Sequence, residues 1–376
     1  MEKALNDLIK ISKKYKKQKD LEHLEVEYLS VFYEGKDFGN YLYKHLSPYF
    51  VSNGSSMGEK NKVYCFVLES VDDYEKYFVH AKKIKHYSPS ENQVFQKAKY
   101  IISTDEDFVY DSQNHCIIYT NRDETIIFSN RLHYNQACKR VIRDELIYGL
   151  VQSQATPSIM LHSSCAVDNT GKAILICGDK GAGKTTTLVN LLDLGYDLLS
   201  NDLTFVKQVD GKIWVKGTPE SINIGLGTAS KFEQLQDIIP ENMRELSDHD
   251  LWSTHLKPEL NWQSFANKFN VKLISEWTEL STILFPKIGE GLVPECNKIE
   301  KIQLKKNLQN SFRGINVGHN IPWSTLIEKR HKEVQSSEIS KLLDGLLNKS
   351  AYKIRYSGKK NELSSLIYES ITKKLS

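Results

Sequence analysis

The chain has 376 residues, of which 40% are hydrophobic, and its 50 Lys and Arg residues nearly balance its 47 Asp and Glu residues. This length exceeds that of a typical single domain and predicts two domains, or one core with a large elaboration. The formal net charge of +3 is too small to indicate binding to nucleic acid or to an anionic membrane through overall charge. We therefore expect no nucleic-acid partner.

The cysteines and the N-terminus indicate a cellular compartment. Six scattered cysteines include no C-x-x-C pair and no Cys/His group at zinc-site spacing, so reduced thiols are expected. The first 20 residues carry charges throughout and lack the apolar stretch of a secretory signal. No run approaches the ~18 apolar residues that span a bilayer. We therefore expect a cytoplasmic protein without a membrane span.

Residues 1–20 predict a helix with a lysine-rich face and a thin apolar face that includes Leu5, Leu8, Ile9 and Ile11. Two interpretations of this helix stay open. One is a solvated surface helix, and the other is a helix that meets a membrane surface or an anionic partner.

Residues 25–130 are rich in aromatic residues and have the texture of strands. The strands are expected at 63–70, 99–103, 116–120 and 125–129. The last two flank a connection of hairpin length, and the whole pattern favours an antiparallel meander. Because no group of chemistry-bearing residues is evident here, we assign residues 1–134 to a β-rich α+β domain that is a scaffold or binds the acceptor.

The most informative stretch is 172–192, which reads KAILICGDKGAGKTTTLVNLL. An apolar run at 173–177 predicts a strand, glycines follow, and apolar residues at helical spacing predict a helix. From Gly178 to Thr185 the sequence fits the phosphate-binding pattern G-x-x-x-x-G-K-[ST]. The expected nucleotide-binding residues are Gly178, Asp179, Lys180, Gly181, Ala182, Gly183, Lys184, Thr185 and Thr186.

Each residue type in this motif has a physical role. The glycines permit φ > 0 and let backbone N–H groups approach phosphate oxygens where a Cβ would block them. Lys184 is long enough to place its ammonium on the β- and γ-phosphates, and Thr185 offers a hydroxyl to magnesium. The helix directs its positive end at the anion. The motif therefore predicts ATP and Mg²⁺ as cofactors.

The segments that flank the loop complete a local unit. Upstream, a helix is expected at 135–151, followed by a strand at 159–168 that pairs as a hairpin with the loop strand. Downstream, Gly195 fits a C-cap, and a strand at 196–200 ends at Asn201 and Asp202. Because ligands gather beyond the carboxyl ends of strands in α/β sheets, Asp202 is the best-placed acid, although an Asp here is also typical of a turn.

The rest of the chain predicts alternating elements. We expect a hairpin at 205–217 that turns at Asp210-Gly211, a mostly helical insertion around 228–280, and a strand at 280–288. After a lysine-bearing segment, a helix at 336–347, a strand at 352–356 and a terminal helix from Asn361 are expected.

The segment from His162 to Val206 resembles the HPr kinase/phosphorylase family. That family has a His before the loop, a GDxGxGK[ST] loop, a glycine that closes the helix and an Asp-Asp pair after the next strand; here these are His162, residues 178–185, Gly195 and Asn201-Asp202. The combination of VIRDELIYGL, LHSSCAVD, the loop and AYKIRY looks closest to the divergent tailoring kinases of ribosomally made peptides, including lasso-peptide kinases. The resemblance covers roughly residues 135–376.

This resemblance implies an α/β fold for residues 135–376, with a P-loop kinase core of the HPr kinase/PEP carboxykinase type. It implies catalytic roles for Asp202, Lys184 and His162, and magnesium binding by Thr185 and Asp202. His162 can equally be a histidine packed on the sheet, and Asp179 is most simply a loop acid that orients backbone or magnesium-bound water.

Two departures from the family matter. Asn201 replaces the first acid of the pair and cannot accept a proton, so the base role passes to Asp202 or is absent. The Glu-Ile-Arg-Gly signature is missing, and its nearest segment, GTPESINIGLGT, lacks the Arg. We therefore do not expect phosphorylation of the HPr protein.

Residues and resemblance together predict an ATP- and Mg²⁺-dependent kinase that acts on a hydroxyl, of a Ser or Thr in a peptide or small protein. A small-molecule hydroxyl fits the same residues. A nucleotide-gated binding or regulatory protein is the second interpretation, which Asn201 favours. A P-loop ATPase motor is the third, but its arginine finger and downstream acid cannot be placed. The sequence leaves open whether the protein forms an oligomer and whether it prefers ATP or GTP.

Overall fold

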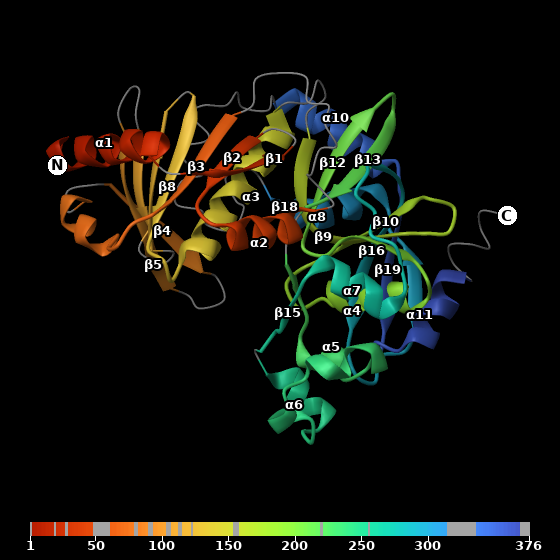
Figure 1. The fold of residues 1–376 in the computed structure, drawn as a ribbon. Coiled ribbons are helices and arrows are strands. Elements are labelled where there is room, and N and C mark those ends of the chain that lie inside the picture. The colour runs from red at the N-terminus through yellow and green to blue at the C-terminus, as the bar shows by residue number, and fades with distance from the viewer. Residues whose placement is uncertain are drawn as a thin grey trace. The chain divides into compact units, whose positions relative to one another are not determined.

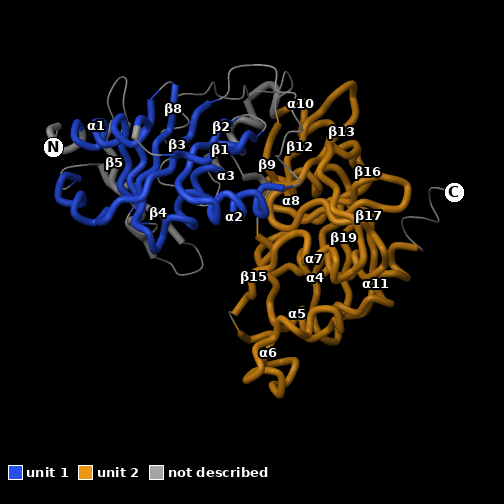
Figure 2. The backbone as a smooth tube through the Cα atoms, viewed as in Figure 1, with its two compact units in different colours: residues 1–155, 314–333 blue, residues 156–313, 334–376 orange. Residues whose placement is uncertain are grey.

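The computed structural model describes residues 2–18, 20–26, 29–47, 61–78, 82–88, 93–102, 107–111, 115–121, 123–152, 158–218, 221–254, 256–313 and 336–368. The chain forms two compact units, residues 1–155 with 314–333 and residues 156–313 with 334–376, which we describe separately (Figures 1 and 2). Both units contain a mixed sheet with helices, so the fold is α/β.

The first unit is built on an eight-stranded sheet with the strand order β1-β2-β3-β8-β7-β6-β5-β4. Its strands are β1 (Glu22–Val26), β2 (Leu29–Tyr33), β3 (Asn61–Val67), β4 (Lys82–Ser88), β5 (Gln93–Ile102), β6 (Asp107–Asp111), β7 (Cys116–Thr120) and β8 (Glu124–Ser129). From β4 to β8 each strand pairs antiparallel with the next, so the predicted antiparallel pattern holds in this part of the sheet, including the hairpin of β7 and β8.

The other half of this sheet corrects the prediction. β3 pairs parallel with both β2 and β8, so an antiparallel pattern throughout is wrong. Parallel neighbours need a crossover connection, and helix α2 (Lys36–Leu46) lies in the connection between β2 and β3. The remaining helices of the unit are α1 (Glu2–Gln18), the 3₁₀ helix η1 (Asp72–Phe78) and α3 (Tyr134–Gln152).

Helix α1 uses its apolar face inside the first unit. Leu8 is fully buried in a core cluster with Phe66 and Phe128, and Ile11 and Tyr15 pack against the same cluster. These contacts favour the solvated surface helix over a membrane-surface helix, because Leu8 is buried and Ile9 and Ile11 already pack against the core of the unit. None of the helices in the described part of the chain combines the length and apolarity needed to cross a bilayer.

His45, at the end of α2, predicts an acid-sensitive first unit. Burial and then the positive charges of Lys139 and Arg143 lower the pKa of His45 from 6.5 to about 3. Since this pKa lies below the unfolded value, the unfolded chain takes up the proton first, and stability is lost as pH falls from about 6.5 towards 3. Each tenfold difference in proton affinity between the folded and unfolded chain corresponds to about 1.4 kcal/mol.

We therefore expect the His45→Gln variant to lose less unfolding free energy than the parent chain between pH 7 and pH 4, measured by urea unfolding. The matched control is His249→Gln, because the His249 side chain is 85% exposed. Parallel pH profiles for the parent and His45→Gln would contradict the expectation.

The second unit is built on a nine-stranded sheet with the main order β10-β9-β12-β13-β16-β19-β17, in which β10 also pairs with β16 and both β11 and β18 pair with β9. Its strands are β9 (Ser158–Val167), β10 (Ala173–Cys177), β11 (Asp197–Ser200), β12 (Leu203–Val209), β13 (Lys212–Gly217), β16 (Thr278–Ile288), β17 (Glu295–Lys298), β18 (Phe312–Arg313) and β19 (Ser350–Tyr356). A separate small sheet pairs β14 (Ile222–Asn223) with β15 (Glu259–Leu260).

Helices cover this sheet and form the segment between β14 and β16. They are α4 (Lys184–Asp193), α5 (Leu226–Ala229), η2 (Glu233–Ile238), η3 (Glu241–Met243), α6 (Asp248–Ser253), α7 (Trp262–Phe269), α8 (Lys301–Ser311), α10 (Ser336–Leu347) and α11 (Lys360–Ile367). α4 packs against β9 and β10 and is flanked by α7 and α11. Leu304 and Leu308 of α8 enter the main core with Leu342 and Leu346 of α10.

Several sequence predictions for this unit are confirmed. β9 and β10 form the expected antiparallel hairpin, and β12 and β13 form the second one. That second hairpin turns at Asp210 with φ 50° and Gly211 with φ 75°, as a two-residue turn of this type requires. The strand predicted at 280–288, the helix at 336–347 and the strand at 352–356 are also present.

Candidate functional site

The predicted phosphate loop has the required strand, loop and helix. β10 ends at Cys177, residues 178–183 form the loop, and α4 begins at Lys184. The loop glycines adopt the left-handed region that favours glycine, with φ 148° at Gly178, 83° at Gly181 and 102° at Gly183. Backbone of this conformation that leads into a helix N-terminus is typical of loops that bind anions.

Gly183 is fixed by a neighbouring strand as well as by its own φ. β16 runs parallel to β10 with Ile176 opposite Leu284, so the end of β16 continues alongside the loop. A Cβ at Gly183 would lie 2.5 Å from Cδ1 of Ile288. Any side chain at this position would therefore force Ile288 to shift, in addition to the strain of a positive φ.

We expect Gly183→Ala to weaken nucleotide binding and to lower the unfolding free energy by about 1–3 kcal/mol, because overpacking adds to the cost of a left-handed alanine. The control is Gly195→Ala at the other end of α4, which has φ 88° but nothing within 4 Å of the new Cβ. Thermal unfolding and nucleotide titration would measure both. The double variant Gly183→Ala, Ile288→Ala should recover part of the loss, and no recovery would contradict the steric explanation.

The side chain of Lys184 is buried against its own loop. It is 8% exposed, and its Nζ donates hydrogen bonds to the backbone oxygens of Gly178 at 2.9 Å and Asp179 at 3.2 Å. The ammonium thus lies across the loop that the glycines shape.

The threonines at the start of α4 are used differently. Thr185 is half-buried at the first turn, and no hydrogen bond to its hydroxyl is found among the described residues. Thr186 is buried, and its hydroxyl is 2.8 Å from that of Thr228 in the short helix α5. Thr185 is therefore the threonine with a hydroxyl available for magnesium, and a role for Thr186 in nucleotide binding stays a prediction. Residues 219 and 220, from the segment nearest to the missing family signature, lie outside the described residues.

His162 and Asp202 contact each other. Nε2 of His162, on β9, lies 3.0 Å from Oδ1 of Asp202, which precedes β12. The contact follows from the pairing of β9 with β12, where Leu203 faces His162 and the N–H of Ser163 donates to the backbone oxygen of Asp202. The His162 side chain is 15% exposed and that of Asp202 39%, so the carboxylate keeps access to solvent.

Strand register brings this pair to the edge of the sheet where the phosphate loop begins. Cys177, the last residue of β10, faces Ser163 of β9, so His162 is the next residue beyond that pair. β11 flanks the same end of β9, with Ser200 opposite Cys165. The carboxyl ends of β10 and β11 thus meet at one edge, as the sequence predicts for Asp202 and the loop.

Asn201 supplies a buried oxygen at this edge. It is 5% exposed, and its Oδ1 makes no hydrogen bond in the part of the chain that the structure describes. The described residues contain no group of three or more His, Cys, Asp or Glu that could hold a metal. Mg²⁺ prefers oxygen ligands and binds through one or two carboxylates together with water and substrate phosphates. The unpartnered amide oxygen, the Asp202 carboxylate and the Thr185 hydroxyl fit that preference.

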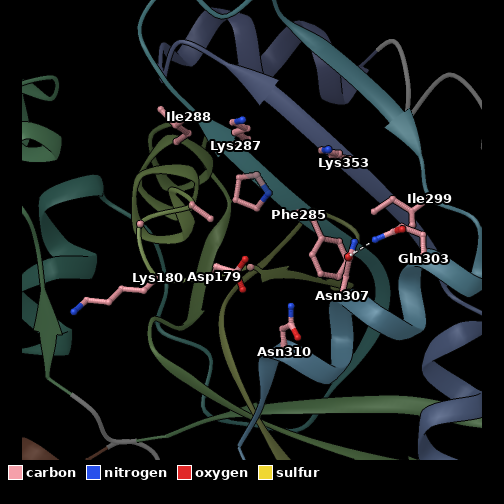
Figure 3. A pocket seen from close by; sticks show the side chains of 14 residues that line it. Asp179, Lys180, Phe285, Lys287, Ile288, Ile299, Gln303, Asn307, Asn310 and Lys353 are labelled. Atoms are coloured by element: carbon pink, nitrogen blue, oxygen red, sulfur yellow. Dashed lines mark hydrogen bonds between the residues drawn. The ribbon is translucent and has the colours of Figure 1, made fainter. Parts of the chain in front are cut away.

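A cavity of about 480 Å³ borders the loop on another side. Its walls come from the loop, from the end of β16, from Lys353 of β19 and from polar side chains of α8 (Figure 3). The sequence patterns did not point to the α8 residues Gln303, Asn307 and Asn310 or to the β16 residue Phe285. The available signal was the spacing of three amides at i, i+4 and i+7, which places them on one face of a helix.

Comparisons with known proteins give little further information. No protein-family model matches the chain, and no curated protein matches it. Among solved structures, the HPr(Ser) kinase/phosphatase from Coxiella burnetii matches with a TM-score of 0.27 and 11% sequence identity, over 58% of this chain and 99% of that one. A TM-score this low carries no argument about fold or activity, so the functional case depends on the residues of the site.

Proposed function

We propose that the protein is an ATP- and Mg²⁺-dependent kinase that transfers the γ-phosphoryl group to a hydroxyl, most simply that of a Ser or Thr in a peptide or small protein. The observation that carries this proposal is the meeting of the phosphate loop and the His162–Asp202 pair at one sheet edge. A carboxylate beside a triphosphate site is what a phosphotransferase needs to receive the proton of an acceptor hydroxyl.

The residues divide the work of transfer. The loop N–H groups and Lys184 hold the phosphates and offset the negative charge that they carry. Thr185, Asp202 and the amide oxygen of Asn201 would hold Mg²⁺. The bound ion would neutralise more of the negative charge of the phosphates. Asp202 accepts the proton of the acceptor hydroxyl. At the same time the hydroxyl oxygen forms a bond to the γ-phosphorus, and the bond between the γ-phosphorus and the β,γ-bridging oxygen breaks. Nε2 of His162 lies 3.0 Å from Oδ1 of Asp202, and we assign His162 the role of orienting this carboxylate.

His162 is then a positioning residue, and its variants should separate by hydrogen-bonding ability. Gln at this position can still donate to Asp202, whereas Leu cannot, so we expect His162→Leu to lower kcat about tenfold more than His162→Gln. The Leu variant should also shift the acidic limb of the pH–rate profile, since the hydrogen bond stabilises the charged carboxylate. Equal kcat values and unshifted pH–rate profiles for both variants would show that His162 has only a packing role.

The direct test is incubation of the protein with γ-labelled ATP, Mg²⁺ and a panel of hydroxyl acceptors. The panel would contain Ser- and Thr-bearing peptides, the free amino acids and simple sugars, so that it covers both peptide and small-molecule hydroxyls. Labelled acceptor that depends on Asp202 supports the kinase. The role of residues 1–134 in acceptor binding is tested in the same assay, by cross-linking the labelled acceptor and locating the modified residues.

A second function has one observation in its favour. Asn201 occupies a position where a kinase would use an acidic residue. A protein in which the nucleotide only orders a loop does not require an acid at that position. Such a nucleotide-gated binding protein would bind Mg·ATP and yield no labelled product on any acceptor. Binding without transfer, together with an ATP-dependent change in protease sensitivity, would favour this alternative.

A further inference from the structure

The cavity beside the phosphate loop has no role in the transfer step, yet it opens directly from the loop. Residues 178–182 form one wall, and the described residues that complete it belong to β16, β19, α8 and the residues before α8. Its volume of about 480 Å³ lies in the range of small-molecule sites. A second cavity, of about 420 Å³, is lined by none of the loop residues.

One wall of the cavity is built for hydrogen bonding. Asp179 from the loop and Asn307 and Asn310 from α8 gather around the same space, whereas Lys180 points away from it (Figure 3). Gln303 donates through Nε2 to Oδ1 of Asn307 at 2.7 Å. This bond fixes the orientation of the Asn307 amide and leaves its Nδ2 donors for another partner.

Part of the lining is apolar and aromatic. Phe285 and Pro286 of β16 line the cavity, and Phe285 is 7% exposed, so only a small part of its ring faces the cavity, beside Asn307 (Figure 3). A planar ligand that stacks on such a surface gains more than its buried area alone provides. Stacking surface and oriented amides together suit a heteroaromatic ring with donors and acceptors on its edge.

The charges in the cavity disfavour a second anion at the polar wall. The Asp179 carboxylate only accepts hydrogen bonds and would repel an anionic group there. A ring with an exocyclic amine or a ring N–H would instead donate to it. Lys287 and Lys353, both exposed on neighbouring strands, supply positive charge elsewhere on the rim, where the ribose and α-phosphate of a nucleotide would pass.

We propose that this cavity holds the purine base of the nucleotide whose phosphates occupy the loop. The base stacks on Phe285, receives a hydrogen bond from Asn307 at a ring nitrogen and donates to Asp179. This assignment deepens the proposed function and depends on it, because the phosphate loop must first hold a triphosphate.

The experiment compares Mg·ATP with Mg·tripolyphosphate, which carries the phosphates without the nucleoside. Asn307→Leu removes the amide at nearly constant volume, and Gln309→Leu makes the same kind of change on an exposed residue of α8 that does not line the cavity. By calorimetry we expect Asn307→Leu to weaken Mg·ATP binding about tenfold, the loss of one hydrogen bond, and to leave tripolyphosphate binding within about twofold. Gln309→Leu should change neither.

Two results overturn the assignment. One is unchanged Mg·ATP binding by Asn307→Leu, which would indicate that the cavity binds the acceptor. The other is that Asn307→Leu weakens the binding of Mg·ATP and of Mg·tripolyphosphate equally. Failure of the proposed function itself has a different signature, since the parent chain would then bind neither ligand, or would bind both without any effect of Lys184→Ala. Thermal unfolding of each variant shows whether the fold is retained, and Asn310→Leu provides a second test if Asn307→Leu does not fold.

Discussion

Asp202→Asn is expected to lower the rate of phosphoryl transfer by about 10²- to 10⁴-fold, the usual contribution of a general base. The substitution keeps the size of the side chain and an oxygen that can accept from His162 at the present distance of 3.0 Å. It removes the ability to take a proton from the acceptor hydroxyl. Mg·ATP affinity should change less than the rate, because the loop and Lys184 are the proposed phosphate contacts and Thr185 and Asn201 remain as proposed ligands for Mg²⁺.

The measurement is steady-state transfer from γ-labelled ATP, with Mg·ATP affinity determined in parallel by calorimetry. Asp197→Asn is the matched control, since Asp197 begins the same strand β11 and accepts a hydrogen bond from the N–H of Lys272 at 2.8 Å. It should leave the rate within about twofold, as expected for a surface change away from the site. A rate for Asp202→Asn equal to that of the parent would remove Asp202 from the base role and return the question to Asp179.

The phosphate loop could be predicted from the sequence because its causes are local. A β-branched run, three glycines and a helical pattern occupy about 20 consecutive residues, and each residue type is required by the φ angle or contact at its own position. The hairpins could be predicted for the same reason, since β9 and β10, like β12 and β13, are joined by short turns.

The pairing of distant strands could not be predicted in this way. β3 lies between β2 and β8 in parallel, and nothing in the alternation of its residues distinguishes that arrangement from an antiparallel one. The partner of a strand depends on crossover connections, such as the one that contains α2, and these have no short sequence signature. The parallel pairing of β3 could therefore not be read from its local sequence pattern.

The site shows both cases. Asp202 could be placed near the loop because the strand before it is short and follows the loop helix directly, and the contact with His162 then follows from the register of β9 and β12. The cavity wall could not be foreseen, because Phe285 and the amides of α8 lie more than 100 residues after the loop in the chain. The parallel pairing of β10 with β16 brings Phe285 to the loop, and the packing of α8 against β9 brings the amides there.

Lys184→Met is expected to weaken Mg·ATP binding at least about 100-fold and to abolish detectable transfer. Methionine keeps the length and burial of the side chain but removes an ammonium that would make charge-assisted hydrogen bonds worth about 1.5–3 kcal/mol each. It also removes the donor to the backbone oxygens of Gly178 and Asp179, which lie 2.9 and 3.2 Å from Nζ. The loss of affinity therefore has two sources, the missing contacts with the phosphates and the missing hydrogen bonds within the loop.

Salt and a matched lysine separate these parts. Lys172→Met removes a lysine at the other end of β10, where it pairs with Glu279 on β16, and should leave Mg·ATP affinity within about threefold. If Lys184 acts through charge, raising the salt concentration should weaken Mg·ATP binding by the parent chain more than by Lys184→Met, because less attraction remains to be screened in the variant. Mg·ATP affinity of Lys184→Met equal to that of the parent would show that the loop does not hold a triphosphate, and with it the kinase proposal would fall.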